Sequence, residues 1–176
     1  MFAFAAVGLA QKRPFDVNAL MELKRMSDPQ ISPDGRWVTF TVQSVDVAAN
    51  KKPTQIWIVP IEGGSPRQIT REGEANHRAR WSPDSKRIAY ISDRGGSSQI
   101  WTMDPDGDEE KQATNLSTEA DGVTFSPDGK NLLFTSEVYP ECGADEACNK
   151  KNLDAEQASK VKARIYTELL YRRWSA

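Results

Sequence analysis

The sequence predicts an all-β protein, a partial β-propeller of about two and a half to three four-stranded blades, with a short N-terminal helix and a C-terminal helical insertion. Two repeated phrases predict this fold. "SPDGRWVTF" at residues 32–40 returns as "SPDSKRIAY" at 82–90 and as "SPDGKNLLF" at 126–134. "QIWIVP" at 55–60 returns as "QIWTMD" at 99–104. A period of ~40–50 residues with several strands per unit is typical of propeller blades around a central channel.

Each copy of the first phrase joins a tight turn to a strand. Ser suits the first position of a type I turn, Pro presets φ at the second, and Gly fits the fourth. The residues that follow alternate, so that Val38 and Phe40 share one face while Thr39 lies on the other. Both faces are mostly apolar or small, which predicts a strand that is covered on two sides.

The two phrases supply the middle strands of each blade, and shorter segments supply the others. The strands expected in the first blade lie near 28–32, 36–43, 55–60 and 66–70. Those expected in the second lie near 78–82, 87–92, 99–104 and 111–116. The third blade begins with 122–126 and 131–137, so the propeller segment is expected to span residues 27–139.

The N-terminal residues differ from the repeats. Residues 1–10, "MFAFAAVGLA", resemble the apolar core and small-residue cleavage site of a secretory signal peptide, with a buried N-terminal strand as the alternative. This run is too short for a membrane-spanning helix, which needs ~20 apolar residues. Residues 11–26 are expected to form a lead helix with Asp16 as its N-cap.

After Pro140 the strand pattern stops. We expect residues 140–176 to form a cysteine loop followed by a helical insertion. The helix is expected within 154–174, where helix formers dominate and Val161, Ile165 and Leu169 recur at four-residue spacing.

The chain has two cysteines, Cys142 and Cys148, six positions apart. An exported protein meets oxidising conditions, so the pair is a candidate disulfide, with two free thiols as the alternative. A zinc site is disfavoured because the lone histidine, His77, is far away in the sequence.

Composition limits the partners that the protein can have. Its 176 residues suffice for one domain of ordinary size, and the hydrophobic share of 38% with a charged share of 27% is that of a globular protein. The net charge is −2 and the basic residues are dispersed, which argues against nucleic acid, since phosphate neutralisation needs a concentrated basic face. We expect a periplasmic or secreted protein without a stable membrane span.

The repeats do not complete a ring. Propellers close with ~4–8 blades, whereas this sequence holds two full units and part of a third. Repeat arrays whose ends are uncovered expose apolar sheet surface. We therefore expect the chain to be the N-terminal part of a longer protein.

Longer phrases around the repeats carry a family resemblance. "LKRMSDPQISPDGRWVTFTV", "QIWIVPIEGGSPRQIT" and "RWSPDSKRIAYISDRGGSSQIW" closely resemble the propeller domain of the prolyl oligopeptidase family of serine peptidases. "FTSEVYPEC", followed by a helical segment that ends in "YRRW", is most similar to the dipeptidyl-peptidase 5 type within the acylaminoacyl-peptidase and dipeptidyl-peptidase branch. The resemblance covers roughly Asp16 to Trp174.

This resemblance implies a two-domain enzyme in which the propeller covers an α/β-hydrolase domain that supplies the catalytic Ser, Asp and His. The propeller would gate short peptide substrates and contact the hydrolase domain, and no cofactor is implied. The present chain lacks a "GxSxG" nucleophile elbow, and none of the family's catalytic positions maps onto it. A non-enzymatic, TolB-like periplasmic propeller that binds proteins is the alternative.

Three smaller features of the sequence have a structural explanation. His77 is expected to be a surface or turn residue, and the acidic run at 104–110 a polar outer hairpin, because it lacks the calcium-loop pattern. Four tryptophans recur at the same places in the repeats and are therefore expected to pack within blades: Trp37, Trp57, Trp81 and Trp101.

Glu168 on the expected insertion helix is a candidate ligand for a substrate's free amino group. In related dipeptidyl-peptidases acidic residues on a propeller helix have this role, through charge-assisted hydrogen bonds. An ion pair with Arg172, four residues on, or an exposed helix face is the competing interpretation.

Overall fold

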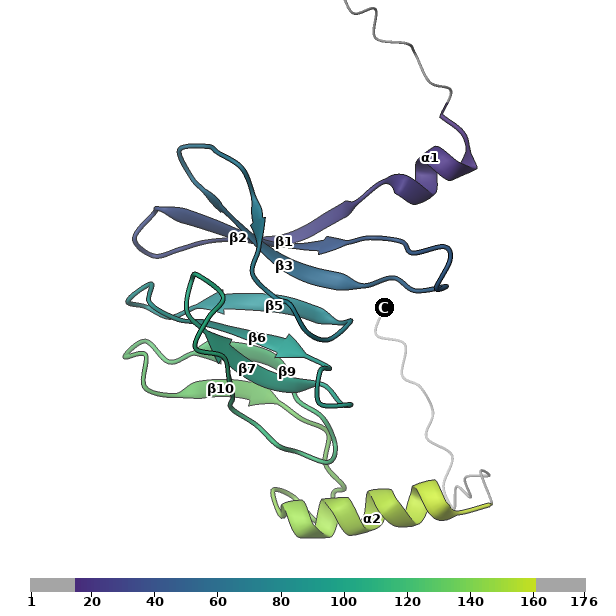
Figure 1. The fold of residues 1–176 in the computed structure, drawn as a ribbon. Helices are drawn as coiled ribbons and strands as arrows, with labels where there is room; N and C mark the ends of the chain where they lie inside the picture. Colours follow the sequence, from purple (N-terminus) through teal and green to yellow (C-terminus); the bar gives the residue numbers. More distant parts are fainter. Residues whose placement is uncertain (1–14, 161–176) are drawn as a thin grey trace, which may run out of the picture.

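The computed structural model describes residues 15–160 and consists of antiparallel sheets stacked face to face, with a helix at each end (Figure 1). Blade 1 comprises β1 (Arg25–Ile31), β2 (Trp37–Gln43), β3 (Thr54–Pro60) and β4 (Arg67–Gln68). Blade 2 comprises β5 (Asn76–Trp81), β6 (Ile88–Ser92), β7 (Gln99–Met103) and β8 (Lys111–Gln112). Blade 3 is represented by β9 (Asp121–Phe125) and β10 (Leu132–Thr135). The predicted partial propeller is confirmed.

The repeated Ser-Pro-Asp phrase forms the same turn in each blade. In blade 1 the Gly35 amide donates to the Ser32 carbonyl at 2.8 Å, which closes the turn. The Ser32 hydroxyl donates to Asp34 at 2.6 Å and accepts from the Trp37 amide at 2.9 Å, which fixes the start of β2. Equivalent bonds recur from Ser82 and Ser126. The hydrogen bond from the Ser32 hydroxyl lowers the pKa of the Asp34 carboxyl, and a weaker contribution in the same direction comes from the Arg36 amide.

A second repeated element binds β3 to β4 and β7 to β8. The Thr70 hydroxyl donates to Gln55 Oε1 at 2.6 Å and accepts from the Ile56 amide at 3.0 Å. In blade 2 the Thr114 hydroxyl makes the same two bonds with Gln99 and the Ile100 amide. These bonds explain why Gln precedes the Ile-Trp pair in both copies.

The core lies between the blades. One buried cluster joins blade 1 to one face of blade 2: Ile56, Ile58, Ile69, Ala79, Ile88, Tyr90 and Met103. The other joins the opposite face of blade 2 to blade 3: Ala89, Ile91, Ile100, Ala120 and Val123. All five residues of β6 are buried, as expected for a strand that is covered on two sides.

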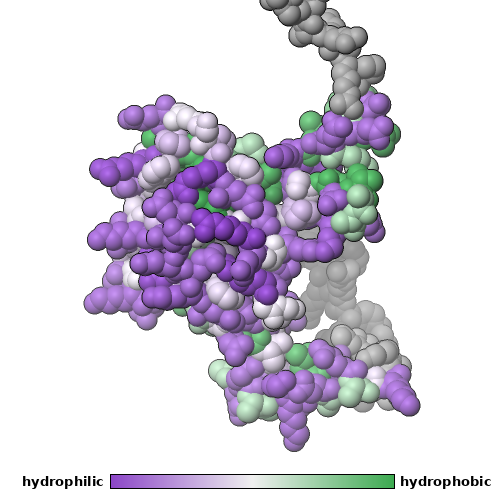
Figure 2. All heavy atoms as spheres, viewed as in Figure 1, coloured by the Kyte–Doolittle hydropathy of each residue, from purple (hydrophilic) through white to green (hydrophobic). Residues whose placement is uncertain are grey.

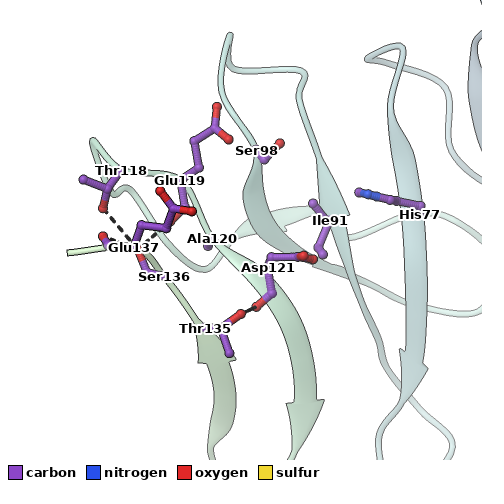
Figure 3. Close-up of a pocket in the computed structure, with 10 residues that line it drawn as sticks. All are labelled: His77, Ile91, Ser98, Thr118, Glu119, Ala120, Asp121, Thr135, Ser136 and Glu137. Atoms are coloured by element: carbon purple, nitrogen blue, oxygen red, sulfur yellow. Dashed lines mark hydrogen bonds between the residues drawn. The ribbon is translucent and has the colours of Figure 1, made fainter. Parts of the chain in front are cut away.

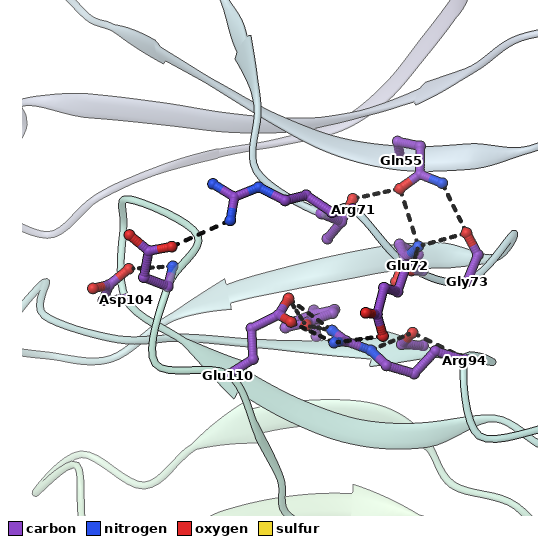
Figure 4. A network of polar contacts seen from close by, with 12 residues as sticks. Gln55, Arg71, Glu72, Gly73, Arg94, Asp104 and Glu110 are labelled. Carbon is purple, nitrogen blue, oxygen red and sulfur yellow. Dashed lines mark hydrogen bonds and ion pairs between the residues drawn. The ribbon is translucent and has the colours of Figure 1, made fainter.

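Blade 2 is further tied together by a buried arginine (Figure 4). The Arg94 side chain is 7% exposed and is hydrogen-bonded to Glu110 and to the Tyr90 hydroxyl, with its guanidinium 4.1 Å from the centre of the Trp101 ring. The hydrogen bonds from Arg94 hold the pKa of Glu110 below its usual value, against the effect of burial. The network therefore connects β6, β7 and the residue that precedes β8 through a single cation.

Polar contacts between blades 1 and 2 meet at the acidic run at 104–110, which forms the β7–β8 turn as expected. Arg67 donates to the Pro105 carbonyl at 2.7 Å and pairs with Asp106 at 2.7 Å. Gly107 in this turn adopts φ +82°, and a Cβ there would lie 2.5 Å from the Ile69 carbonyl oxygen. The run thus serves as an inter-blade contact.

The outer faces of blades 1 and 3 are uncovered in the described part of the chain. Leu133 of β10 is 69% exposed, as expected for apolar sheet surface at an uncovered end of the blade array. Trp37, Trp81 and Trp101 pack against the core as expected, but Trp57 lies on the open face of blade 1. Hydrophobic side chains also gather around α1 (Val17–Glu22), as Figure 2 shows.

The flanking helices have other bounds than expected. Asp16 caps α1 as predicted, but the helix ends at Glu22, and β1 begins at Arg25. The second helix, α2 (Glu146–Ala158), starts inside the cysteine loop rather than at 154, because Asp145 caps its first turn by accepting from the Ala147 and Cys148 amides. The expected helical spacing of Val161, Ile165 and Leu169 lies outside the described residues.

The close approach at Gly107 makes a testable prediction. Gly107→Ala should lower the free energy of unfolding by about 3 kcal/mol, since it combines left-handed backbone strain with a clash against Ile69. Gly35→Ala is the matched control: φ is +71° but no atom lies within 4 Å of the added Cβ, so the loss should be about 1 kcal/mol. Urea denaturation monitored by tryptophan fluorescence measures both, and equal losses would contradict the assigned contact.

Candidate functional site

The innermost strands of the blades, β1, β5 and β9, carry a polar surface at a repeated bulge. Asp28, Arg78 and Gly122 each lie four positions before the serine of the turn phrase, and they have φ of 49°, 55° and 64°. The pairing register shifts beside each of them. Inner strands line the central channel of a closed propeller. The bulges therefore direct unrepeated side chains to the surface on which a propeller binds ligands.

A first hollow of about 510 Å³ lies between blades 1 and 2. Blade 1 contributes an acid, hydroxyls and an amide, and blade 2 contributes basic residues: Ser27, Asp28, Thr41, Gln43, Thr54, His77, Arg78 and Arg80. Arg80 pairs with Asp28 at 2.8 Å, and the two side chains are only 30% and 27% exposed. The hollow thus has one ion pair across its walls and an excess of cationic groups.

A second hollow of about 450 Å³ lies between blades 2 and 3 (Figure 3). It has three carboxylates and no arginine or lysine in its lining: His77, Ile91, Ser98, Thr118, Glu119, Ala120, Asp121, Thr135, Ser136 and Glu137. Arg78 pairs with Asp121 at 3.3 Å, which links this hollow to the first. Such a surface attracts cationic groups.

The two hollows are repeat-equivalent. Ser27 and Thr54 of the first hollow have His77 and Ser98 as their repeat equivalents in the second. His77 also lines the first hollow, and its own equivalent in the second is Asp121. The same backbone geometry therefore recurs with opposite charge. The repeat maintains the shape, and the unrepeated residues set the chemistry.

His77 lies between the two hollows, on strand β5 and not in the turn that was one of its two expected places. It is a half-buried residue of β5, paired in register with Ile91, and lines both hollows. Burial lowers the pKa of the imidazole below its usual 6.5, although the Asp121 carboxylate acts in the opposite direction. A neutral imidazole can both donate and accept at neutral pH.

The arrangement is suited to binding rather than to nucleophilic catalysis. His77, Asp121 and Ser98 line one hollow, yet no hydrogen bond joins them: His77 Nδ1 is unpartnered, and the Asp121 side chain bonds Arg78 and the Gly122 amide. A triad needs a nucleophile and a base within hydrogen-bond reach. Within residues 15–160, no cluster of His, Cys, Asp and Glu has the arrangement of a metal site.

A third hollow of about 420 Å³ lies between blade 3 and α2 and shares Glu119 and Glu137 with the second. Its far wall is the insertion, which is anchored by Asn149: this 2% exposed side chain accepts from the Tyr139 amide and donates to the Gly143 and Asp145 carbonyls. The insertion therefore extends the acidic surface.

The sequence-predicted site residues have mixed outcomes. Cys142 and Cys148 are joined by a disulfide with a Cα–Cα distance of 5.5 Å, at the start of α2. Glu168 and the signal-like residues 1–10 lie outside the described residues. The sequence analysis missed Asp28, Arg78 and Arg80. These residues could have been found from their fixed places four or two positions before the turn phrase.

No helix in the described range is long and apolar enough to span a membrane.

Four-stranded antiparallel blades, repeated turns and a polar inner surface define the chain as a β-propeller protein. The model of the TolB beta propeller domain family matches residues 18–162. The chain belongs to this family.

Curated relatives carry peptidase names. Dipeptidyl-peptidase 5 of Porphyromonas gingivalis is 36% identical over 77 residues, which are 44% of this chain and 11% of that protein. The uncharacterized peptidase YuxL of Bacillus subtilis is 30% identical over 83 residues, 47% of this chain and 12% of that protein. These matches confirm the resemblance to peptidase propellers, and the matched segment spans only about a tenth of each relative's length.

Solved structures agree on the fold. The acylaminoacyl peptidase of Pyrococcus horikoshii superposes with a TM-score of 0.57 at 24% identity, covering 69% of this chain and 18% of that chain. The propeller domain of the Trilobed protease from Pyrococcus furiosus, described as having an open velcro topology, gives a TM-score of 0.51 at 24% identity, covering 63% and 33%.

The partly buried environment of His77 predicts a low midpoint for the titration of its imidazole. Because burial depresses the folded pKa, the proton NMR signal of His77 should titrate with a midpoint below 6.5, and Asp121→Asn should lower the midpoint further. The unfolded state then binds more protons than the folded state, so stability should fall as the pH decreases from 6.5 toward the folded pKa. Asp154→Asn on α2 is the control without effect; a midpoint at or above 6.5 would refute the assignment.

Proposed function

We propose that this chain is the N-terminal propeller portion of a serine peptidase that releases short peptides, of the dipeptidyl or acylaminoacyl type. The observation that carries the proposal is the 36% identity to dipeptidyl-peptidase 5 over 77 residues of a propeller whose inner surface is polar. In this proposal residues 27–139 gate peptide substrates, residues 140–176 form an insertion beside the channel, and an α/β-hydrolase domain supplies the nucleophile.

The exposed apolar faces support a longer protein. On the face of blade 1 away from blade 2, Met26 and Trp57 line a hollow of about 270 Å³ with Phe40, Val42, Lys24 and Pro66. Met26 is 68% exposed, and β10 of blade 3 has Leu133 at 69%. Large apolar patches of this kind are normally covered by a partner surface, which in a propeller is the next blade.

We also propose export, with residues 1–10 as a signal-peptide remnant and 11–26 as the lead segment. The disulfide between Cys142 and Cys148 supports a periplasmic or secreted location, because such bonds persist in oxidising compartments. The TolB family name of the matched propeller is in keeping with this location.

A fluorophosphonate probe tests the peptidase assignment. The full-length protein should form a covalent adduct at a serine outside the propeller, since a serine peptidase nucleophile attacks phosphorus as it attacks a peptide carbonyl. Peptide mapping by mass spectrometry locates the label, and heat-denatured protein is the control. A native protein that takes no label, and whose remaining sequence encodes only further blades, would favour the TolB-like binding propeller.

Thiol alkylation tests the location. Protein from the cell envelope or medium, denatured without reductant, should take up no iodoacetamide at Cys142 or Cys148, and should take up two equivalents after reduction. Replacing both cysteines by serine should lower the free energy of unfolding by about 2 kcal/mol, as expected for a short closed loop. Full alkylation without reductant would contradict an oxidised pair.

A further inference from the structure

The hollow between blades 1 and 2 is built from two chemically different walls. The wall from blade 1 is formed mainly by hydroxyl and amide groups, including Ser27 and Thr41, which are paired across β1 and β2. The wall from blade 2 presents Arg78 and Arg80 from the bulged strand β5. Hydroxyl and guanidinium donors therefore face one another across the hollow.

Thr41 is the most informative residue of this hollow. It is 4% exposed, and its Oγ1 has no hydrogen-bond partner. Thr39, two residues earlier on the same face of β2, donates instead to the Gln30 carbonyl at 3.4 Å. An unpaired buried hydroxyl is costly, and an acceptor bound in the hollow would satisfy it.

The guanidinium groups retain donors for a ligand. Arg78 uses Nη1 to contact Asp121, and Arg80 uses Nη1 to contact Asp28 and the Ala79 carbonyl. A guanidinium has five N–H donors in a planar fork, and this fork matches the two oxygens of a carboxylate. With one acid against two arginines, the lining itself is cationic.

Comparison of the equivalent hollows indicates that this chemistry is not needed for the fold. The turn serines and the Gln–Thr bonds recur from blade to blade, whereas the positions of Arg78 and Arg80 are taken by Gly122 and Thr124 in blade 3. A purely structural role would be expected to recur with the other structural residues.

We propose that the hollow between blades 1 and 2 is a carboxylate site for short peptides. Arg78 and Arg80 hold the carboxylate, and the Thr41 hydroxyl donates to it. The inference rests on the proposed function, which makes short peptides the available ligands. The carboxylate is either the C-terminus of a peptide or an acidic side chain, and the same chemistry recognises both.

Calorimetric titration of the full-length protein tests the site without relying on catalysis. N-acetyl-trialanine with a free C-terminus should bind about tenfold more tightly than its C-terminal amide, because a hydrogen-bonded charge is lost in the amide. N-acetyl-Ala-Glu-Ala amide separates the two sources: tight binding of this peptide alone assigns the site to acidic side chains. Equal affinity for all three peptides would overturn the proposal.

Two variants and two controls locate the site. Arg78→Gln and the isosteric Thr41→Val should each weaken binding of the acid peptide about tenfold, and Thr41→Val should not lower the thermal midpoint of the free protein, since no hydrogen bond is lost. Thr39→Val, outside the hollow, and Arg36→Gln, an exposed arginine, should leave binding unchanged. Unchanged binding in Thr41→Val, in a protein that remains folded, would refute the assigned donor.

The peptide-binding result and the fluorophosphonate result test the carboxylate site and the proposed function separately. A protein that takes the fluorophosphonate label but binds all three peptides with equal affinity keeps the peptidase assignment and loses the carboxylate site. A protein that takes no label but binds the acid peptide keeps the site as that of a peptide-binding propeller.

Discussion

The structure depends on one constraint: a blade has two apolar faces, and both can be buried only against other blades. Strand β6 makes this plain, because Ile88 and Tyr90 enter the cluster shared with blade 1, whereas Ala89 and Ile91 enter the cluster shared with blade 3. Burial of apolar area at ~25 cal/mol per Å² therefore stabilises the stack rather than any single sheet. Where no neighbour is described, on the outer faces of blades 1 and 3, apolar side chains remain exposed.

The stacking constraint explains which residues repeat and which do not. A Ser-Pro-Asp turn sets where each second strand begins, and a Gln–Thr pair ties the third strand to the fourth, so both recur with the same bonds. The bulge on the inner strand recurs as a backbone conformation, with Asp28, Arg78 and Gly122 in its left-handed position. Side chains at the bulge lie at the blade junctions, where Asp28 pairs with Arg80 and Arg78 pairs with Asp121. The residue type at the bulge therefore varies while its backbone conformation is kept.

The sequence predicted the blades well because strands, turns and the repeat period are local signals. It failed where tertiary context decides: Trp57 has the same sequence neighbours as Trp101, but within residues 15–160 no blade lies against its face of blade 1. His77 was misjudged because a lone polar residue gives no sign that two hollows will flank it. The start of α2 was missed because the Asp145 cap lies within a loop that was assigned to the disulfide alone.

The two channel-facing hollows are chemically distinct but physically connected. Strand β5 separates them and supplies His77 to both, and Arg78 of the first pairs with Asp121 of the second. Arg78 contacts Asp121 through Nη1, so its other N–H donors can bind a ligand in the first hollow while the ion pair persists. Asp121 also acts on His77: its carboxylate raises the pKa of the imidazole, against the larger lowering that burial causes. The ion pair between Arg78 and Asp121, together with the shared His77, therefore joins the linings of the two blade junctions.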